Sequence, residues 1–161
     1  APSPGRYMGN GCSSAQMSEC EKALERGREN HWCSLAGKGL KCVPPPAMEA
    51  STLLRLDLSR NMLRELPHTL GKLVNLQALF LRENRLVSLP EEIGLCVALE
   101  EIHADSNRLT ALPDSVGDLF GLRVLRLRDN LLHTVPNTLG RCHRLRVLDV
   151  RALPCLLLLF V

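Results

Sequence analysis

Residues 53–75 read LLRLDLSRNMLRELPHTLGKLVN, and residues 76–98 read LQALFLRENRLVSLPEEIGLCVA, which keeps the same Leu, Asn, Pro and Gly spacing 23 places later. A fixed period of roughly 20–50 residues is typical of solenoids, in which each unit stacks on the next. The sequence therefore predicts a repetitive core rather than an irregular globular one. The repeated columns are Leu53, Leu76, Leu99, Leu122 and Leu145; Asn61, Asn84, Asn107 and Asn130; Pro67, Pro90, Pro113 and Pro136; and Gly71, Gly94, Gly117 and Gly140.

The chemistry of one unit predicts its local structure. Leu56 and Leu58 alternate with polar residues, which indicates a short strand with its apolar side chains facing inward. Asn61 follows, and we expect its buried side-chain amide to pair with backbone groups that no strand ladder reaches. Pro67 then directs the chain onto the outer face. The predicted fold class is α/β, a curved solenoid with parallel strands on the concave face and short helices or irregular turns on the convex face.

The repeat also predicts the domain boundaries. Four full units cover residues 53–144, and a partial fifth unit begins at residue 145. A degenerate unit occupies residues 33–52, where Lys38 replaces the Asn. The whole repeat domain is therefore expected to span residues 33–150.

The two ends differ from the repeat. Residues 1–17 are expected to be disordered, and Ser18 with Glu21 makes a capping-box pattern that predicts a short helix within residues 18–32. Ala23, Leu24 and Trp32 would place that helix over the open first unit. Residues 151–161 form a divergent apolar tail, which we interpret as a truncated or alternative end; the alternative is an irregular lid over the last unit.

Composition excludes several classes of function. The chain of 161 residues has a net charge of +3 and only 3% aromatic residues, with no basic block that would indicate nucleic-acid binding. Seven cysteines at irregular spacing, without a CxxC pair, argue against a zinc site or a disulfide framework. Cys96 and Cys142 fall in the Leu73 column and are expected to be buried apolar residues. This cysteine usage favours the reducing cytosol.

A Leu-Pro pair followed three residues later by Leu-Gly or Ile-Gly, as in Leu66-Pro67 with Leu70-Gly71, carries a family resemblance. Residues 33–150 resemble intracellular leucine-rich-repeat proteins of the 23-residue class. That class includes Ras-pathway scaffolds, plant intracellular Ras-group proteins and small leucine-rich-repeat-containing proteins. The resemblance implies a monomeric, non-catalytic adaptor or scaffold in intracellular signalling, with a small GTPase or a phosphatase subunit as its partner and no cofactor or metal. The alternative is a truncated isoform that acts as a regulatory subunit or decoy of a longer protein.

The outward strand residues predict the binding surface, because they line the concave face in columns. An exposed Phe80 beside arginines has the composition of a binding hot spot. His103 lies between Glu101 and Asp105, but without a pocket or a nucleophile we do not assign a metal or acid–base site. No catalytic residue is assigned. The candidate protein-binding residues are Arg55, Asp57, Phe80, Arg82, Glu101, His103, Asp105, Arg126, Arg128 and Asp149.

The segment Met8-Gly9-Asn10-Gly11-Cys12-Ser13 fits an N-myristoylation motif if translation starts at Met8. Gly9 would accept the myristate and Cys12 a palmitate, and the two chains together would anchor the protein peripherally. The alternative is a Gly/Ser-rich terminus that matches by chance. The expected location is the cytoplasm, at the inner face of a membrane when lipidated.

Overall fold

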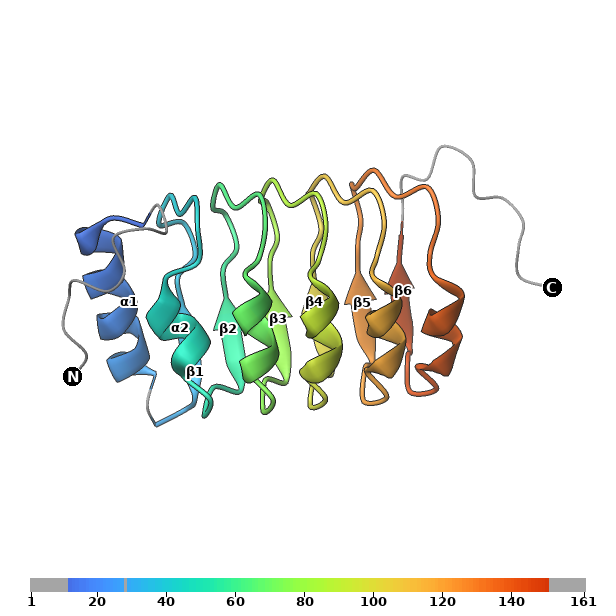
Figure 1. Ribbon diagram of the computed structural model, residues 1–161, viewed down its shortest axis with the longest axis horizontal. Helices are drawn as coiled ribbons and strands as arrows, with labels where there is room; N and C mark the ends of the chain where they lie inside the picture. The colour runs from blue at the N-terminus through green and yellow to red at the C-terminus, as the bar shows by residue number, and fades with distance from the viewer. Residues whose placement is uncertain (1–11, 28, 151–161) are drawn as a thin grey trace.

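The computed structural model describes residues 12–27 and 29–150, and in these residues six short parallel strands lie side by side in sequence order (Figure 1). Each residue of a strand pairs with the residue 23 places later, as Leu56 pairs with Leu79 and Leu79 with Ile102. One repeat therefore adds one strand. The strands are β1 (Trp32–Ser34), β2 (Arg55–Asp57), β3 (Ala78–Phe80), β4 (Glu101–His103), β5 (Val124–Arg126) and β6 (Val147–Asp149).

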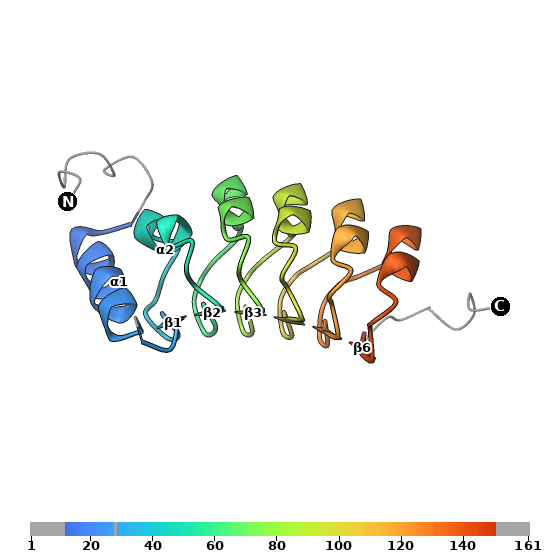
Figure 2. The ribbon, with the colours of Figure 1, turned by 90° about the horizontal axis from the view of Figure 1, so that it is seen from below.

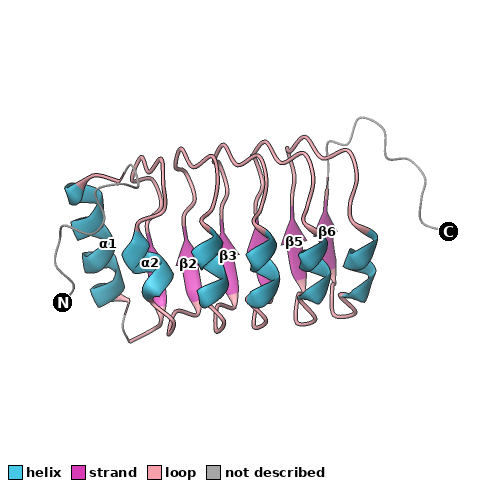
Figure 3. Cartoon of the chain, in the orientation of Figure 1, coloured by secondary structure: helices cyan, strands magenta, loops and turns pink. Residues whose placement is uncertain are grey.

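Short helices form the opposite face, and the row of units curves with the strands on its concave side (Figures 2 and 3). Each 3-10 helix begins directly after the repeated proline, whose fixed φ turns the chain into the helix. Neighbouring helices pack so closely that a Cβ at Gly117 would overlap the Thr138 backbone. The helices are α1 (Ser14–Arg26), α2 (Pro45–Glu49), η2 (His68–Lys72), η3 (Glu91–Leu95), η4 (Asp114–Asp118) and η5 (Asn137–Arg141).

One continuous core of leucines runs between the two faces. The inward strand residues Leu56, Leu79, Ile102 and Leu125 are all fully buried. Removing a leucine side chain from water stabilises a fold by about 1.5–3 kcal/mol, so the repeated leucine columns supply the main driving force. The predicted α/β solenoid, with parallel strands on the concave face, is confirmed.

The repeated asparagines form a ladder inside the turns that follow the strands. Nδ2 of Asn107 donates to the carbonyls of Leu81 (2.9 Å) and Ala104 (3.1 Å), and its Oδ1 accepts from the Leu86 amide (3.0 Å). Each asparagine thereby joins its own unit to the preceding one. Asn61, Asn84 and Asn130 make the equivalent bonds, and all four residues are buried.

The N-terminal helix differs from the prediction. It begins at Ser14 rather than Ser18, because Ser13 and Gln16 make a reciprocal capping box in which each side chain accepts from the other residue's backbone N–H. It ends at Arg26, and Trp32 belongs to β1, where its side chain is exposed rather than packed under the helix. Residues 12–17 are therefore part of the folded end of the molecule.

The cysteines of the first unit also correct a prediction. Cys12 and Cys42 form a disulfide, although irregular cysteine spacing argued against one, because α1 lies over the first turn of the solenoid and brings the two residues together. Cys20 on α1 and Cys33 on β1 are free and fully buried. A hydrogen bond with Cys33, together with burial, raises the pKa of the Cys20 thiol. The predicted burial of Cys96 and Cys142 is confirmed.

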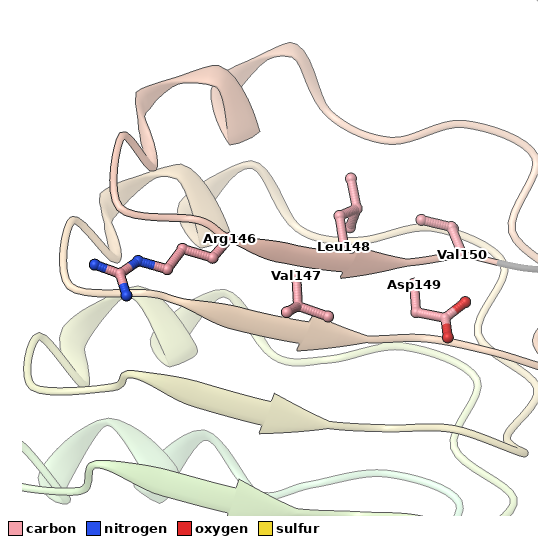
Figure 4. A pocket seen from close by; sticks show the side chains of 5 residues that line it. All are labelled: Arg146, Val147, Leu148, Asp149 and Val150. Atoms are coloured by element: carbon pink, nitrogen blue, oxygen red, sulfur yellow. The ribbon is translucent and has the colours of Figure 1, made fainter.

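The C-terminal end of the described chain is open. Leu148 of β6 is 37% exposed, whereas Leu125, one unit earlier, is fully buried. Residues 146–150 line a hollow of about 490 Å³ beside this strand (Figure 4). The predicted apolar tail, residues 151–161, and the start of the predicted N-terminal segment, residues 1–11, lie outside the described residues. Among the helices that the structure describes, none has the length and apolar character needed to span a bilayer.

Candidate protein-binding surface

The concave sheet brings five of the predicted binding residues together on β3, β4 and the turns after them. We call these residues the central cluster: Phe80, Arg82, Glu101, His103 and Asp105. Because β3 and β4 are parallel and in register, Phe80 lies directly opposite His103. The two rings stack with centroids 4.9 Å apart and an interplanar angle of 28°.

Polar contacts connect the rest of the central cluster. Nη2 of Arg82 lies 2.8 Å from Nδ1 of His103, and Nε of Arg82 lies 3.0 Å from Oδ2 of Asp105. Nε2 of His103 lies 3.0 Å from Oε2 of Glu101. The guanidinium is therefore held between an imidazole and a carboxylate. Such mutual contacts fix the side-chain conformations before any partner arrives.

These contacts also assign hydrogen-bond roles to the two ring nitrogens of His103. A guanidinium has donors and no acceptor, so Nδ1 of His103 must accept from Arg82. The ring proton then sits on Nε2, which donates to Glu101. His103 is a buried, hydrogen-bonded residue that supports Phe80 and Arg82 and offers little surface of its own.

Phe80 is half-buried rather than freely exposed, which corrects the sequence-based expectation. The stacked His103 covers one face of its ring. Beside it lies a hollow of about 220 Å³, lined by Arg55, Gln77, Ala78, Phe80, Glu100 and Glu101. The sequence analysis missed Gln77 and Glu100, because they precede the strands and fall outside the alternating pattern used to choose outward residues. Ala78 and Ser59, both in outward columns, are buried.

The remaining predicted residues lie on either side of the central cluster, where Arg55 lines the hollow beside Phe80 and the Arg128 backbone amide donates to Oδ1 of Asp105 (3.1 Å). Arg55 and Arg126 are exposed at strand positions, and Asp57 uses Oδ1 to accept from the Ser59 amide (2.9 Å). Arg128 is exposed, with Nε 3.6 Å from Oδ2 of the equally exposed Asp129. An ion pair this exposed contributes little, so the Arg128 side chain stays available. Asp149 is half-buried on β6.

The geometry provides no catalytic centre that we can assign. Within residues 12–27 and 29–150, no group of three or more His, Cys, Asp or Glu side chains is placed to hold a metal ion. Burial raises the pKa of the Cys96 thiol to about 11, and its Sγ donates to the Leu70 carbonyl. A thiol in that state is a poor nucleophile at neutral pH.

The lipidation motif is only partly described. Gly9 lies outside the described residues. Cys12 forms the disulfide with Cys42, and a sulfur atom in that bond has no thiol to acylate. Palmitoylation of Cys12 is therefore incompatible with this form of the protein, which corrects the sequence-based expectation.

Comparison with known proteins agrees with this architecture. The Leucine Rich Repeat family profile matches residues 52–73. No curated protein sequence matches the chain.

Solved structures match over most of the chain. This chain is similar to a leucine-rich-repeat protein of Leptospira interrogans, with 31% identity and a TM-score of 0.60 over 79% of this chain and 39% of the Leptospira chain. YopM from Yersinia enterocolitica matches with 30% identity and a TM-score of 0.59 over 74% of this chain and 24% of its own. The plant peptide hormone receptor RGFR1, solved in complex with RGF2, matches with 33% identity and a TM-score of 0.60 over 68% of this chain and 18% of the receptor chain. The chain thus spans 39% or less of these proteins.

Four observations point to the same fold: the 23-residue register, the buried Leu and Asn columns, the family profile and the similarity to these solved structures. Together they identify the fold of this chain as an α/β solenoid of the leucine-rich-repeat type.

Proposed function

We propose that this protein is a non-catalytic adaptor that binds another protein through its concave face. The observation that carries the proposal is the pre-formed central cluster, in which Phe80 stacks on His103 and Arg82 is fixed by His103 and Asp105. Aromatic and arginine side chains dominate binding hot spots. Side chains that are already ordered lose little conformational entropy when a partner binds.

The charges of this face favour a partner with an acidic surface. Glu101 and Asp105 are engaged by His103 and Arg82, whereas Arg55 and Arg126 form no ion pair among the described residues. The charge left for a partner is therefore mainly positive. By resemblance, a small GTPase or a phosphatase subunit in a signalling pathway is the kind of partner we propose. The similarity to a receptor solved with RGF2 supports a protein ligand.

The test is affinity capture followed by reconstitution with the purified partner. Phe80→Ala should weaken binding by about 2 kcal/mol, roughly 30-fold in Kd, because it removes the ring at the centre of the surface. Phe120→Ala is the matched control, since Phe120 is 63% exposed and lies away from the concave strands. Equal affinities for the Phe80 and Phe120 variants, with unchanged thermal unfolding, would contradict the proposal.

A second reading of the function has an observation of its own. The open face at β6 and the hollow along residues 146–150 fit a solenoid that continues in a longer parent protein. In that case the chain acts as a regulatory or decoy form that competes for the parent's partner. A longer transcript that resumes the 23-residue pattern after Val150 would support this reading. Competition between the two forms for one partner would then be measured directly.

The cellular location of the protein is a separate proposal, which two measurements test. The sequence favours the cytoplasm, with membrane attachment through Gly9 when Met8 initiates translation. The Cys12–Cys42 disulfide instead is typical of an oxidising compartment. Thiol labelling of the protein in intact cells distinguishes the two, because reduced Cys12 and Cys42 would both be labelled in the cytosol. A Gly9→Ala variant that leaves the membrane fraction would support the myristate, and an unchanged distribution would exclude it.

A further inference from the structure

Exposed apolar side chains lie at the end of helix η3 and on the turns that lead from the convex helices into the strands. These turns form the lower edge in Figure 1. Val97 and Phe120 are each 63% exposed, and Leu95 is 57% exposed. Because the register carries each residue to the one 23 places later, Val97 and Phe120 are neighbours in adjacent units. Exposed apolar residues are ordinary when scattered, but a contiguous group indicates a contact surface.

Basic residues continue the same row in the next unit. His143 follows Phe120 at the 23-residue step, and Arg144 and Arg146 beside it are exposed. The nearby carboxylates each lie beside another arginine of this edge, with Glu100 Oε2 3.2 Å from Arg123 Nη1 and Asp118 Oδ1 3.6 Å from Arg141 Nη1. Within the described part of the chain, neither Arg144 nor Arg146 forms an ion pair. This edge therefore combines apolar side chains with uncompensated positive charge.

The opposite edge, formed by the turns that follow the strands, is different. Arg85 and Arg108 are exposed there, next to the exposed Glu83 and Asp129. Leu131 is exposed on this edge, but Arg108 and Arg85 occupy its column in the two preceding units. The repeat pattern alone does not require an apolar edge, because the two edges share the same period.

We propose that the basic-apolar edge, made of Leu95, Val97, Phe120, Arg144 and Arg146, binds the surface of an anionic lipid bilayer. Val97 and Phe120 sit on successive turns along the edge, and Leu95 ends helix η3 just before the first of these turns. Apolar side chains exposed along one edge can enter the interfacial layer of a membrane together. The arginines lie in the same row and would contact anionic headgroups, which attract basic side chains near the surface. None of the five residues of the central cluster belongs to this edge, although Glu100, which lies at the edge, also lines the hollow beside Phe80.

The experiment measures flotation of the purified full-length chain with phosphatidylcholine vesicles, prepared with and without phosphatidylserine. Binding should require phosphatidylserine and should fall as salt is added. Arg144→Glu with Arg146→Glu should lower the partition coefficient at least about tenfold, because attraction becomes repulsion. Phe120→Ser should lower it by roughly fivefold, because the ring no longer enters the interface.

Matched controls keep this test specific. Arg85→Glu with Arg108→Glu changes the net charge equally on the opposite edge, and Leu131→Ser removes a similarly exposed apolar side chain there. Both controls, and Phe80→Ala, should bind vesicles as the unmodified chain does. Equal binding by edge variants and controls overturns the proposal. Failure to bind phosphatidylserine vesicles, or equal binding to both vesicle types, also overturns it. Either result leaves the proposed protein-binding face untouched.

Discussion

The two ends of this solenoid differ in how much of the terminal unit is covered by another element. At the N-terminal end, α1 lies over β1 and buries Cys20 and Ala23 against the first unit. At the C-terminal end, β6 has β5 on one side, and Val147 and Leu148 remain 38% and 37% exposed. Since each unit of a solenoid contacts only its neighbours, a terminal unit loses part of its burial unless another element covers it. Equivalent leucines of the repeat therefore differ in burial according to position, as Leu125 is fully buried and Leu148 is 37% exposed.

The largest expected effect compares one leucine column at the interior and at the open end. Leu79→Ala should destabilise the protein by about 2–5 kcal/mol, because it leaves a cavity in a fully buried site. Leu148→Ala removes the equivalent side chain where water already reaches it, so we expect less than about half of that loss. Urea unfolding of the two variants measures both values. Equal losses would mean that the last unit is as well packed as the interior, and the comparison of ends would fail.

The asparagine ladder gives the next effect. Asn107→Ala should cost about 1–3 kcal/mol for each buried backbone group left without a partner. Asn75→Ala is the control, because its side chain is exposed and makes a single hydrogen bond to the Ser51 carbonyl (3.0 Å). Thermal unfolding midpoints distinguish the two variants. Indistinguishable midpoints would show that the ladder does not hold the interior units together.

A smaller effect tests the capped end. Ser13→Ala should destabilise the protein by about 1 kcal/mol, because it removes the side-chain oxygen that accepts from the Gln16 amide (3.2 Å). Ser18→Ala is a matched control from the same helix, at the position where the sequence pattern placed the cap. Chemical unfolding of both variants identifies the serine that caps α1. A larger loss for Ser18→Ala would restore the sequence-based boundary.

The smallest expected effect concerns the tail. Deleting residues 156–161 should change the unfolding free energy by less than about 0.5 kcal/mol and should improve solubility, because a short uncharged apolar sequence is an aggregation hazard. Light scattering and urea unfolding check the two parts. A loss of several kcal/mol would instead show that the tail covers β6, and the C-terminal end would then be a capped end like the other.

Much of the architecture could be predicted because it depends on a periodic pattern. Leucines at the strand positions and the Asn, Pro and Gly columns led to the parallel solenoid that the structure confirms. The N-terminal boundary was wrong because two overlapping motifs, Ser13 with Gln16 and Ser18 with Glu21, fit one consensus. Local sequence does not distinguish them. Packing of the helix on the first unit does.

The candidate site was predictable as a set of outward residues, but its internal contacts were not. The alternation of inward and outward residues along each strand predicted that Phe80, Glu101 and His103 lie on one face, because side chains of a strand point alternately to opposite sides. It did not show that His103 is buried under Phe80 or that Arg82 is held by Asp105. Those contacts join different units. They depend on which rotamers fit together across the sheet.

The sequence by itself determined the period, the inward leucines and the asparagine column, because each follows from residue type at a repeated spacing. Only the tertiary structure decided conformations that local preference opposes. Arg60 and Glu83 adopt positive φ angles of 56° and 54°, which non-glycine residues rarely take. Their backbone amides donate to the backbone carbonyls of Arg82 (2.8 Å) and Asp105 (3.0 Å) in the next unit. Hydrogen bonds between stacked units stabilise a backbone that the isolated segment would not choose, and such bonds exist only once the solenoid has formed.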